Sequence, residues 1–224
     1  EIMSGLKKAI TEGKVIPVLC GSALKNMAVK PLLAYINYYL PSPVELAGKT
    51  AAELEKESLA ALIFKTLADP YVGKLSMFRV YSGVFKSDSM VYNSNQESEE
   101  KIAQVFSLQG KNQIAVSELK PGDIGAVAKL QVTTTGDTLC SKAAPVQLEG
   151  INFPEPTLPL AIKPKSKGDE DKLSSALTRL LEEDPTLRLT KDTETRETIL
   201  TGMGETHIDI TMERLQRKFG VEVE

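Results

Sequence analysis

The order of hydrophobic patterns in the last third of the chain restricts its fold more than any other feature. Strands are predicted where apolar residues alternate, and amphipathic helices where they recur every three or four residues. In chain order these patterns predict a strand, a helix, two strands, a helix and the start of a strand, over residues 158–162, 169–183, 186–190, 196–201, 208–219 and 221–224. This order predicts a ferredoxin-like βαββαβ unit.

Residues 58–152 carry short apolar runs separated by turn signals and no helical periodicity. Gly83 suits a bulge or a sharp bend, and Pro121-Gly122 fits the central positions of a type II turn. Strands are predicted over 60–67, 74–83, 89–92, 101–108 and 124–130. Short strands at this spacing indicate a closed β-barrel.

The first 43 residues have the pattern of the end of an α/β domain, with helices predicted over 2–12 and 29–40. Between them, the apolar run 14–20 is typical of a buried parallel strand. Two helices and one strand cannot form a stable core alone, so we expect this part to pack on neighbouring structure. Residues 44–57 are charged and rich in alanine, which predicts an exposed linker.

Four segments, in chain order, resemble elongation factor G, the GTPase that drives ribosomal translocation. The tripeptide Ser22-Ala23-Leu24 resembles the last guanine-nucleotide motif of translational GTPases, and segments 64–83 and 119–139 resemble the second domain of the factor. The run Gly202-Met203-Gly204-Glu205-Thr206-His207-Ile208-Asp209 is similar to the glycine-rich signature of its third domain. It departs from that signature at Thr206, Ile208 and Asp209, and only Thr206 changes chemical type.

The resemblance implies a multidomain α+β chain. Residues 1–43 would be the C-terminal part of the GTPase domain, 44–57 a linker, 58–152 the β-barrel domain II, and 153–224 the ferredoxin-like domain III with its last strand truncated. The chain would then be a fragment of a translocase whose parent couples GTP hydrolysis to tRNA and mRNA movement. This part would carry interdomain coupling and ribosome contacts, and the joint near 152–156 would be a hinge.

The resemblance also assigns roles to individual residues. The guanine loop would be Ser22, Ala23 and Leu24, and the turn of domain III that faces the GTPase switch region would contain Gly202, Met203, Gly204, Glu205 and His207. Basic residues of the barrel and of the segment after residue 162 are candidates for contact with ribosomal RNA: Lys74, Arg79, Lys86, Lys163, Lys165 and Lys167. The last three alternate, so an extended backbone would place them on one face.

The chain lacks the other motifs of a nucleotide site. It has no Gly-x-x-x-x-Gly-Lys-Ser/Thr loop and no Asn-Lys-x-Asp motif. Without a phosphate cradle and a Mg²⁺ ligand, GTP hydrolysis lacks its main electrostatic contributions. We therefore expect GTP or GDP with Mg²⁺ only in the full-length parent, with no tightly bound cofactor, no metal site and no catalysis in this chain alone.

His207 is the only histidine, and it leaves other functions open. A catalytic histidine needs a positioned partner, and Glu205 is two residues away, so on a helix it points to another face. A free-standing hydrolase is therefore disfavoured. A ribosome-protection or release-factor-type GTPase remains an alternative, as does a divergent paralogue with a role in ribosome recycling.

Composition limits the partners and the compartment. The net charge of −3 argues against a globally basic nucleic-acid-binding surface, although local patches remain possible. No apolar run of about 18 residues and no signal peptide is present, so we expect a cytoplasmic protein without a membrane partner. Cys20 and Cys140 are predicted to be buried free thiols. The chain starts at Glu1 rather than at a methionine, which suggests a fragment.

Overall fold

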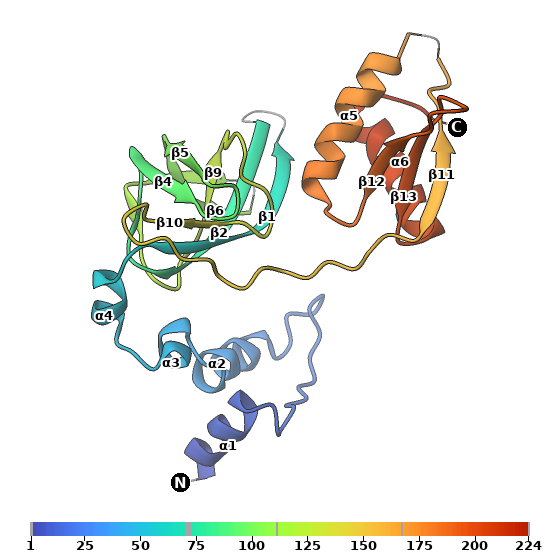
Figure 1. Cartoon of the computed structure of the whole chain (residues 1–224). Coiled ribbons are helices and arrows are strands. Elements are labelled where there is room, and N and C mark those ends of the chain that lie inside the picture. Colours follow the sequence, from blue (N-terminus) through green and yellow to red (C-terminus); the bar gives the residue numbers. More distant parts are fainter. Residues whose placement is uncertain (1, 70–72, 111, 167, 224) are drawn as a thin grey trace. The chain divides into compact units, whose positions relative to one another are not determined.

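The computed structural model describes residues 2–69, 73–110, 112–166 and 168–223 (Figure 1). The chain divides into two compact units, residues 1–54 and 55–224.

The first unit is helical. Helices α1 (Ile2–Thr11) and α2 (Val29–Tyr39) confirm the two predicted helices, and α3 (Pro43–Ala47) and α4 (Ala51–Lys56) follow them. The ring of Tyr39 stacks on Tyr35 with centroids 4.3 Å apart, and its hydroxyl lies 3.1 Å from the sulfur of Met3 in α1. Ser42 and Glu45 form a capping box at the start of α3, so the region predicted as a linker is partly helical.

The strand predicted over 14–20 is not formed, and the segment has no regular structure. Ile16 and Val18 are 84% and 89% exposed, and Cys20 is exposed, contrary to the prediction that it is buried. A buried parallel strand needs strands on both sides to pair its backbone groups. Within the described part of this unit only Tyr39 and Leu54 are buried, so the segment has no sheet to join.

The second unit begins with a strongly curved sheet of eight strands, in the order β5-β4-β10-β1-β2-β9-β6-β7 (Figure 1). All neighbouring pairs are antiparallel. The strands are β1 (Ala60–Asp69), β2 (Gly73–Ser82), β4 (Ser89–Asn93), β5 (Ser98–Ile102), β6 (Val105–Gln109), β7 (Asn112–Val116), β9 (Ile124–Ala128) and β10 (Thr138–Cys140). Among the described residues no ladder joins β5 to β7, so the barrel is open rather than closed.

The predicted strands of this region are largely confirmed, with one correction. The single strand expected over 101–108 is two strands, because residues 103–104 interrupt it and β5 and β6 pair with different neighbours. The short strands β3 (Phe85–Lys86) and β8 (Glu118–Leu119) pair with each other. These two strands, β7 and β10 were not predicted. The type II turn is confirmed, since Gly122 has φ 94° and the Asp123 amide donates to the Lys120 carbonyl at 3.0 Å.

One apolar core fills the curved sheet. Phe78 and Phe85 are fully buried and stack with centroids 4.1 Å apart. Cys140 is buried, as predicted. Gly83 has φ 68°, and a Cβ there would lie 2.6 Å from the Leu59 backbone, so the sharp bend needs glycine.

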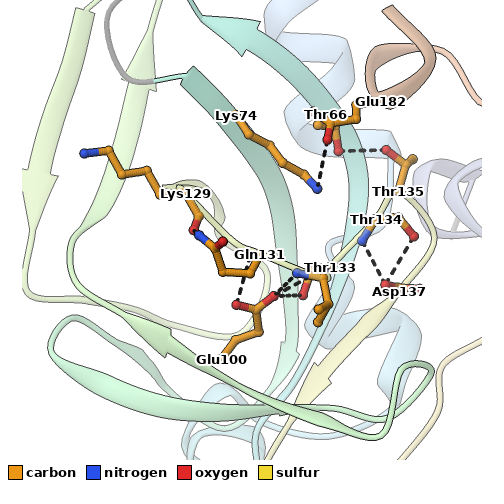
Figure 2. Close-up of polar contacts among 11 residues, drawn as sticks. Thr66, Lys74, Glu100, Lys129, Gln131, Thr133, Thr134, Thr135, Asp137 and Glu182 are labelled. Atoms are coloured by element: carbon orange, nitrogen blue, oxygen red, sulfur yellow. Dashed lines mark hydrogen bonds and ion pairs between the residues drawn. The ribbon is translucent and has the colours of Figure 1, made fainter. Parts of the chain in front are cut away.

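A buried carboxylate holds the loop 129–137 against β5 (Figure 2). Glu100 is 5% exposed and accepts hydrogen bonds from the backbone amides of Gln131, Val132 and Thr133 at 3.1, 2.9 and 3.0 Å. Burial opposes its ionisation most strongly, but these amide bonds together with the Thr133 hydroxyl outweigh it, so the pKa of Glu100 lies below its usual value. Asp137 closes the same loop through the Thr134 amide at 2.8 Å.

Residues 158–223 confirm the ferredoxin-like unit. The elements are β11 (Leu158–Ile162), α5 (Glu170–Glu183), β12 (Arg188–Lys191), β13 (Thr198–Gly202) and α6 (Glu205–Phe219). The strand order is β11-β13-β12, with an isolated bridge from Pro164 to Val223 where the last strand was expected. A second apolar core contains the fully buried Leu200, Ile208 and Leu215.

Candidate functional site

The glycine-rich turn lies between β13, which ends at Gly202, and α6, which begins at Glu205. Gly202 is buried, and a Cβ on it would lie 2.9 Å from Cγ1 of Ile208 and 3.3 Å from Nδ1 of His207. The backbone at Gly202 therefore lies too close to its neighbours for an added side chain. Gly204 is different, since its φ of 170° is ordinary extended backbone and nothing lies within 4 Å of an added Cβ.

The His207 ring joins this turn to the end of α5. The Met203 amide donates to Nδ1 at 3.1 Å, and Nε2 lies 3.1 Å from Oδ2 of Asp184. Because Nδ1 accepts a hydrogen bond, this geometry requires the tautomer that carries its proton on Nε2 and donates it to Asp184. The ring and the carboxylate are 22% and 26% exposed. The sequence did not indicate Asp184 as a partner of His207.

Asp184 is held ionised by its surroundings. It is the C-cap of α5, and its Oδ1 accepts from the amide and the hydroxyl of Thr186 at 2.9 and 2.5 Å. Burial is the largest single influence and would raise the pKa of Asp184, but the Thr186 and His207 hydrogen bonds together lower it below its usual value. The carboxylate is thus a fixed acceptor for the imidazole N–H.

This geometry argues against catalysis by His207. A general base needs a free ring nitrogen facing a nucleophile or a substrate proton. Here one nitrogen accepts a main-chain amide and the other faces a carboxylate, and Glu205 is exposed in the first turn of α6. Nor does the described part of the chain contain three or more His, Cys, Asp or Glu side chains arranged to hold a metal ion. The turn is anchored by the contacts of both imidazole nitrogens.

The three residues predicted for the guanine loop form a tight loop in the first unit. Ser22 and Met27 exchange backbone hydrogen bonds of 3.1 and 2.9 Å, and the loop reverses through Asn26 at φ 52°. Ala23 and Leu24 are exposed, with Leu24 entirely so. The loop exposes backbone groups, and its guanine-binding role stays a prediction.

The predicted RNA-contact residues do not form one patch. Lys74 is only 14% exposed and lies 4.0 Å from Glu182 of α5, so its ammonium group is already directed toward a carboxylate (Figure 2). Arg79 lies over the ring of Tyr81 at 5.6 Å from its centroid. Lys86 is exposed on β3.

The lysines after β11 are placed separately. Lys163 and Lys165 are both exposed beyond the end of that strand, and Lys165 is 3.6 Å from Glu222. Lys167 lies outside the described residues. No helix in the described part of the chain is both long and apolar enough to cross a bilayer.

The fold and the site together define a class of protein: a multidomain chain in which a β-barrel module is followed by a ferredoxin-like module that carries an anchored glycine-rich turn. Comparison with known proteins identifies the family. The family model described as "Elongation factor G domain 2" matches residues 58–142, and that described as "Elongation Factor G, domain III" matches residues 153–224. The chain belongs to the elongation factor G family and contains its second and third domains.

A solved structure also matches the chain. The crystal structure of a protein from Thermus thermophilus matches the whole chain with 32% sequence identity and a TM-score of 0.83. The chain spans about a third of the length of that protein, since the match covers 33% of it.

Proposed function

We propose that this chain is the middle part of a ribosomal translocase and that it transmits the state of a GTPase domain to the rest of the factor. The full-length protein would bind GTP or GDP with Mg²⁺ and couple hydrolysis to movement of tRNA and mRNA. Its partners would be ribosomal RNA, ribosomal proteins and the GTPase domain of its own chain, and it would act in the cytoplasm. The domain limits we propose are 1–43, 44–57, 58–152 and 153–224.

The single observation that carries this proposal is the anchored turn at Gly202–Gly204. A surface that reports nucleotide state needs a backbone of fixed shape, and the buried Gly202 and the His207–Asp184 contact supply one. The same contacts occupy both nitrogens of the imidazole, which supports a role for His207 in anchoring the turn over a role as a general base. The isolated chain is expected to turn over no GTP.

The test uses the full-length protein with programmed ribosomes. Ribosome-stimulated GTP hydrolysis together with advance of the mRNA by one codon is the expected result. Stimulated hydrolysis that ejects another bound factor without moving mRNA would replace this proposal with the ribosome-protection or recycling alternative. Hydrolase activity of the isolated chain that disappears in His207→Ala would overturn the non-catalytic role of the turn.

The joint near residues 152–156 is our proposed hinge between the barrel and the ferredoxin-like unit. It lies in a stretch without helix or strand, residues 145–157. In variants that weaken the contacts between the two domains, ¹⁵N relaxation is expected to give a different rotational correlation time for each domain. Identical tumbling in every variant would contradict a hinge.

A further inference from the structure

The last turn of α5 and its C-cap carry three consecutive carboxylates, Glu182, Glu183 and Asp184, here named the acidic turn. A helix C-terminus carries the negative end of the helix dipole, so carboxylates are disfavoured there. Each of the three nevertheless has a partner on an element other than α5. Asp184 faces His207, Glu183 reaches β1 and α6, and Glu182 reaches β2.

The contact of Glu183 with the barrel is specific. Its Oε1 accepts the backbone amide of Ala68 in β1 at 2.6 Å, and the side chain is only 6% exposed. Strand β1 pairs with β10 only over Ala60–Leu62, so at Ala68 the strand edge away from β2 has no ladder partner among the described residues. The carboxylate therefore satisfies a main-chain donor on an open strand edge.

The same carboxylate also fixes α6. Lys218 in the last turn of that helix donates to both oxygens of Glu183, at 2.8 and 3.1 Å. Helix α6 begins at Glu205, directly after the glycine-rich turn. The acidic turn thus contacts α6 at its C-terminal end through Glu183 and near its N-terminal end through Asp184.

We infer that the acidic turn is the connector between the glycine-rich turn and the barrel, with Asp184 as the positioning residue for His207 and Glu183 as the link to β1. Because the two residues are adjacent at the end of one helix, a displacement of the turn at Met203 moves the acceptor of the Ala68 amide. The biological meaning of this connector rests on the proposed function. The inference adds to that function the residues that couple the two domains. The physical evidence required is an energetic coupling between the two contacts.

The chain offers a one-residue reporter for the first contact, since His207 is its only histidine. In ¹⁵N-histidine-labelled protein the expected spectrum has a protonated Nε2 and an unprotonated Nδ1. In Asp184→Ala the ring loses the contact that positions it, so its hydrogen bond from the Met203 amide should also be lost. The ring should then sample both tautomers, and amide exchange at Met203 should rise about fivefold to tenfold, the loss of one hydrogen bond. Asp184→Asn keeps an oxygen acceptor and should restore the tautomer.

The matched control is Asp209→Ala, which removes an exposed carboxylate from α6 close to the same turn. It should leave the tautomer and the Met203 exchange rate unchanged. An unchanged tautomer in Asp184→Ala, or an equal change in Asp209→Ala, would overturn the positioning role of Asp184.

The second contact is tested at Ala68. Glu183→Ala should raise amide exchange at Ala68 about fivefold to tenfold. The control Glu194→Ala, in the exposed β12–β13 hairpin, should leave it unchanged. If Glu183→Ala fails to fold, Glu183→Gln keeps an acceptor for the amide and removes only the charge paired with Lys218.

Coupling requires that each variant also alters the distant amide. Asp184→Ala should speed exchange at Ala68, Glu183→Ala should speed it at Met203, and the double variant should deviate from the sum of the two. Strictly local and additive effects would overturn the connector. These measurements need no ribosome, so their failure leaves the proposed translocase intact. A full-length protein that is inactive on ribosomes would defeat the translocase and leave the connector standing.

Discussion

The barrel and the ferredoxin-like unit use buried and half-buried carboxylates in two different ways. Glu100 accepts hydrogen bonds from one short loop, Gln131 to Thr133, so it fixes a single piece of backbone within one domain. Glu183 and Asp184 instead take partners from β1, from α6 and from the segment that follows α5. Carboxylates of similar chemistry therefore stabilise one loop or connect several elements, according to where their partners lie.

The largest loss of stability is expected for a change of Glu100, the carboxylate that fixes one loop. Glu100→Ala leaves the amides of residues 131–133 without their acceptor, and should lower the free energy of unfolding by about 3–5 kcal/mol. Urea denaturation measures the change. Glu99→Ala is the matched control on the same strand, because Glu99 is exposed and pairs with Lys142 at the surface. It should cost less than about 1 kcal/mol, and equal losses would contradict the role assigned to Glu100.

The glycine-rich turn provides the second test, with two glycines two residues apart. Gly202→Ala places a Cβ 2.9 Å from the buried Ile208, and should destabilise the chain by about 1–3 kcal/mol through overpacking. Gly204→Ala meets nothing within 4 Å and should cost less than about 1 kcal/mol. Thermal unfolding of the two variants checks this, and similar losses would mean that the close approach at Gly202 is unimportant.

The stability of the chain is expected to depend on pH through both kinds of carboxylate. The pKa values of Glu100 and Asp184 are both lowered in the folded chain, so each contributes stability at pH values above its unfolded pKa of about 4. That stability should be lost as the pH falls from about 4 through the folded pKa, because the unfolded chain then takes up protons first. Urea midpoints between about pH 2 and pH 7 measure it.

Variants assign the pH dependence to each carboxyl group. Glu100→Gln and Asp184→Asn should each flatten the acid limb of the curve by removing one linked group. Curves parallel to that of the wild type would show that neither carboxyl group carries the pH dependence.

The smallest effects are expected at the barrel lysines. Lys86 is exposed, and if it contacts phosphate in the full-length factor, Lys86→Ala should reduce the slope of ribosome affinity against salt by about one. Lys74→Ala should leave that slope nearly unchanged, because Lys74 already faces Glu182 and is largely shielded. Binding titrations at several salt concentrations check both, and a larger change for Lys74 would reverse the assignment.

The spacing of apolar residues correctly predicted the elements that pack on a core formed within the chain. The apolar stripe of α5 and the alternation in β11 and β12 identify these elements because each packs on the core that the chain itself supplies. The strand predicted over 14–20 was wrong because the described part of the chain supplies no core for it. An apolar run of this kind forms a strand only when neighbouring strands are present. The boundary between β5 and β6 was missed because both flanks are β-like and only partner choice separates them.

The site could be predicted only in part. Gly202 and His207 are visible as a local motif, whereas the acidic turn is 18 or more residues away in sequence and has the composition of an ordinary solvated helix end. Asp184-Pro185 after an apolar stripe indicates a helix end and a turn. The sequence around it does not predict that His207 contacts Asp184. Contacts of this kind follow from packing of α5 against α6 and of α6 against β13, which periodicity does not specify.

The most direct test of the account is the rate of mRNA movement and of GTP hydrolysis by the full-length protein carrying Asp184→Ala, on the same programmed ribosomes. If the acidic turn links the glycine-rich turn to the barrel, translocation slows while ribosome-stimulated GTP hydrolysis continues at the wild-type rate. Translocation at the wild-type rate in this variant, with the His207 tautomer demonstrably lost, would contradict it.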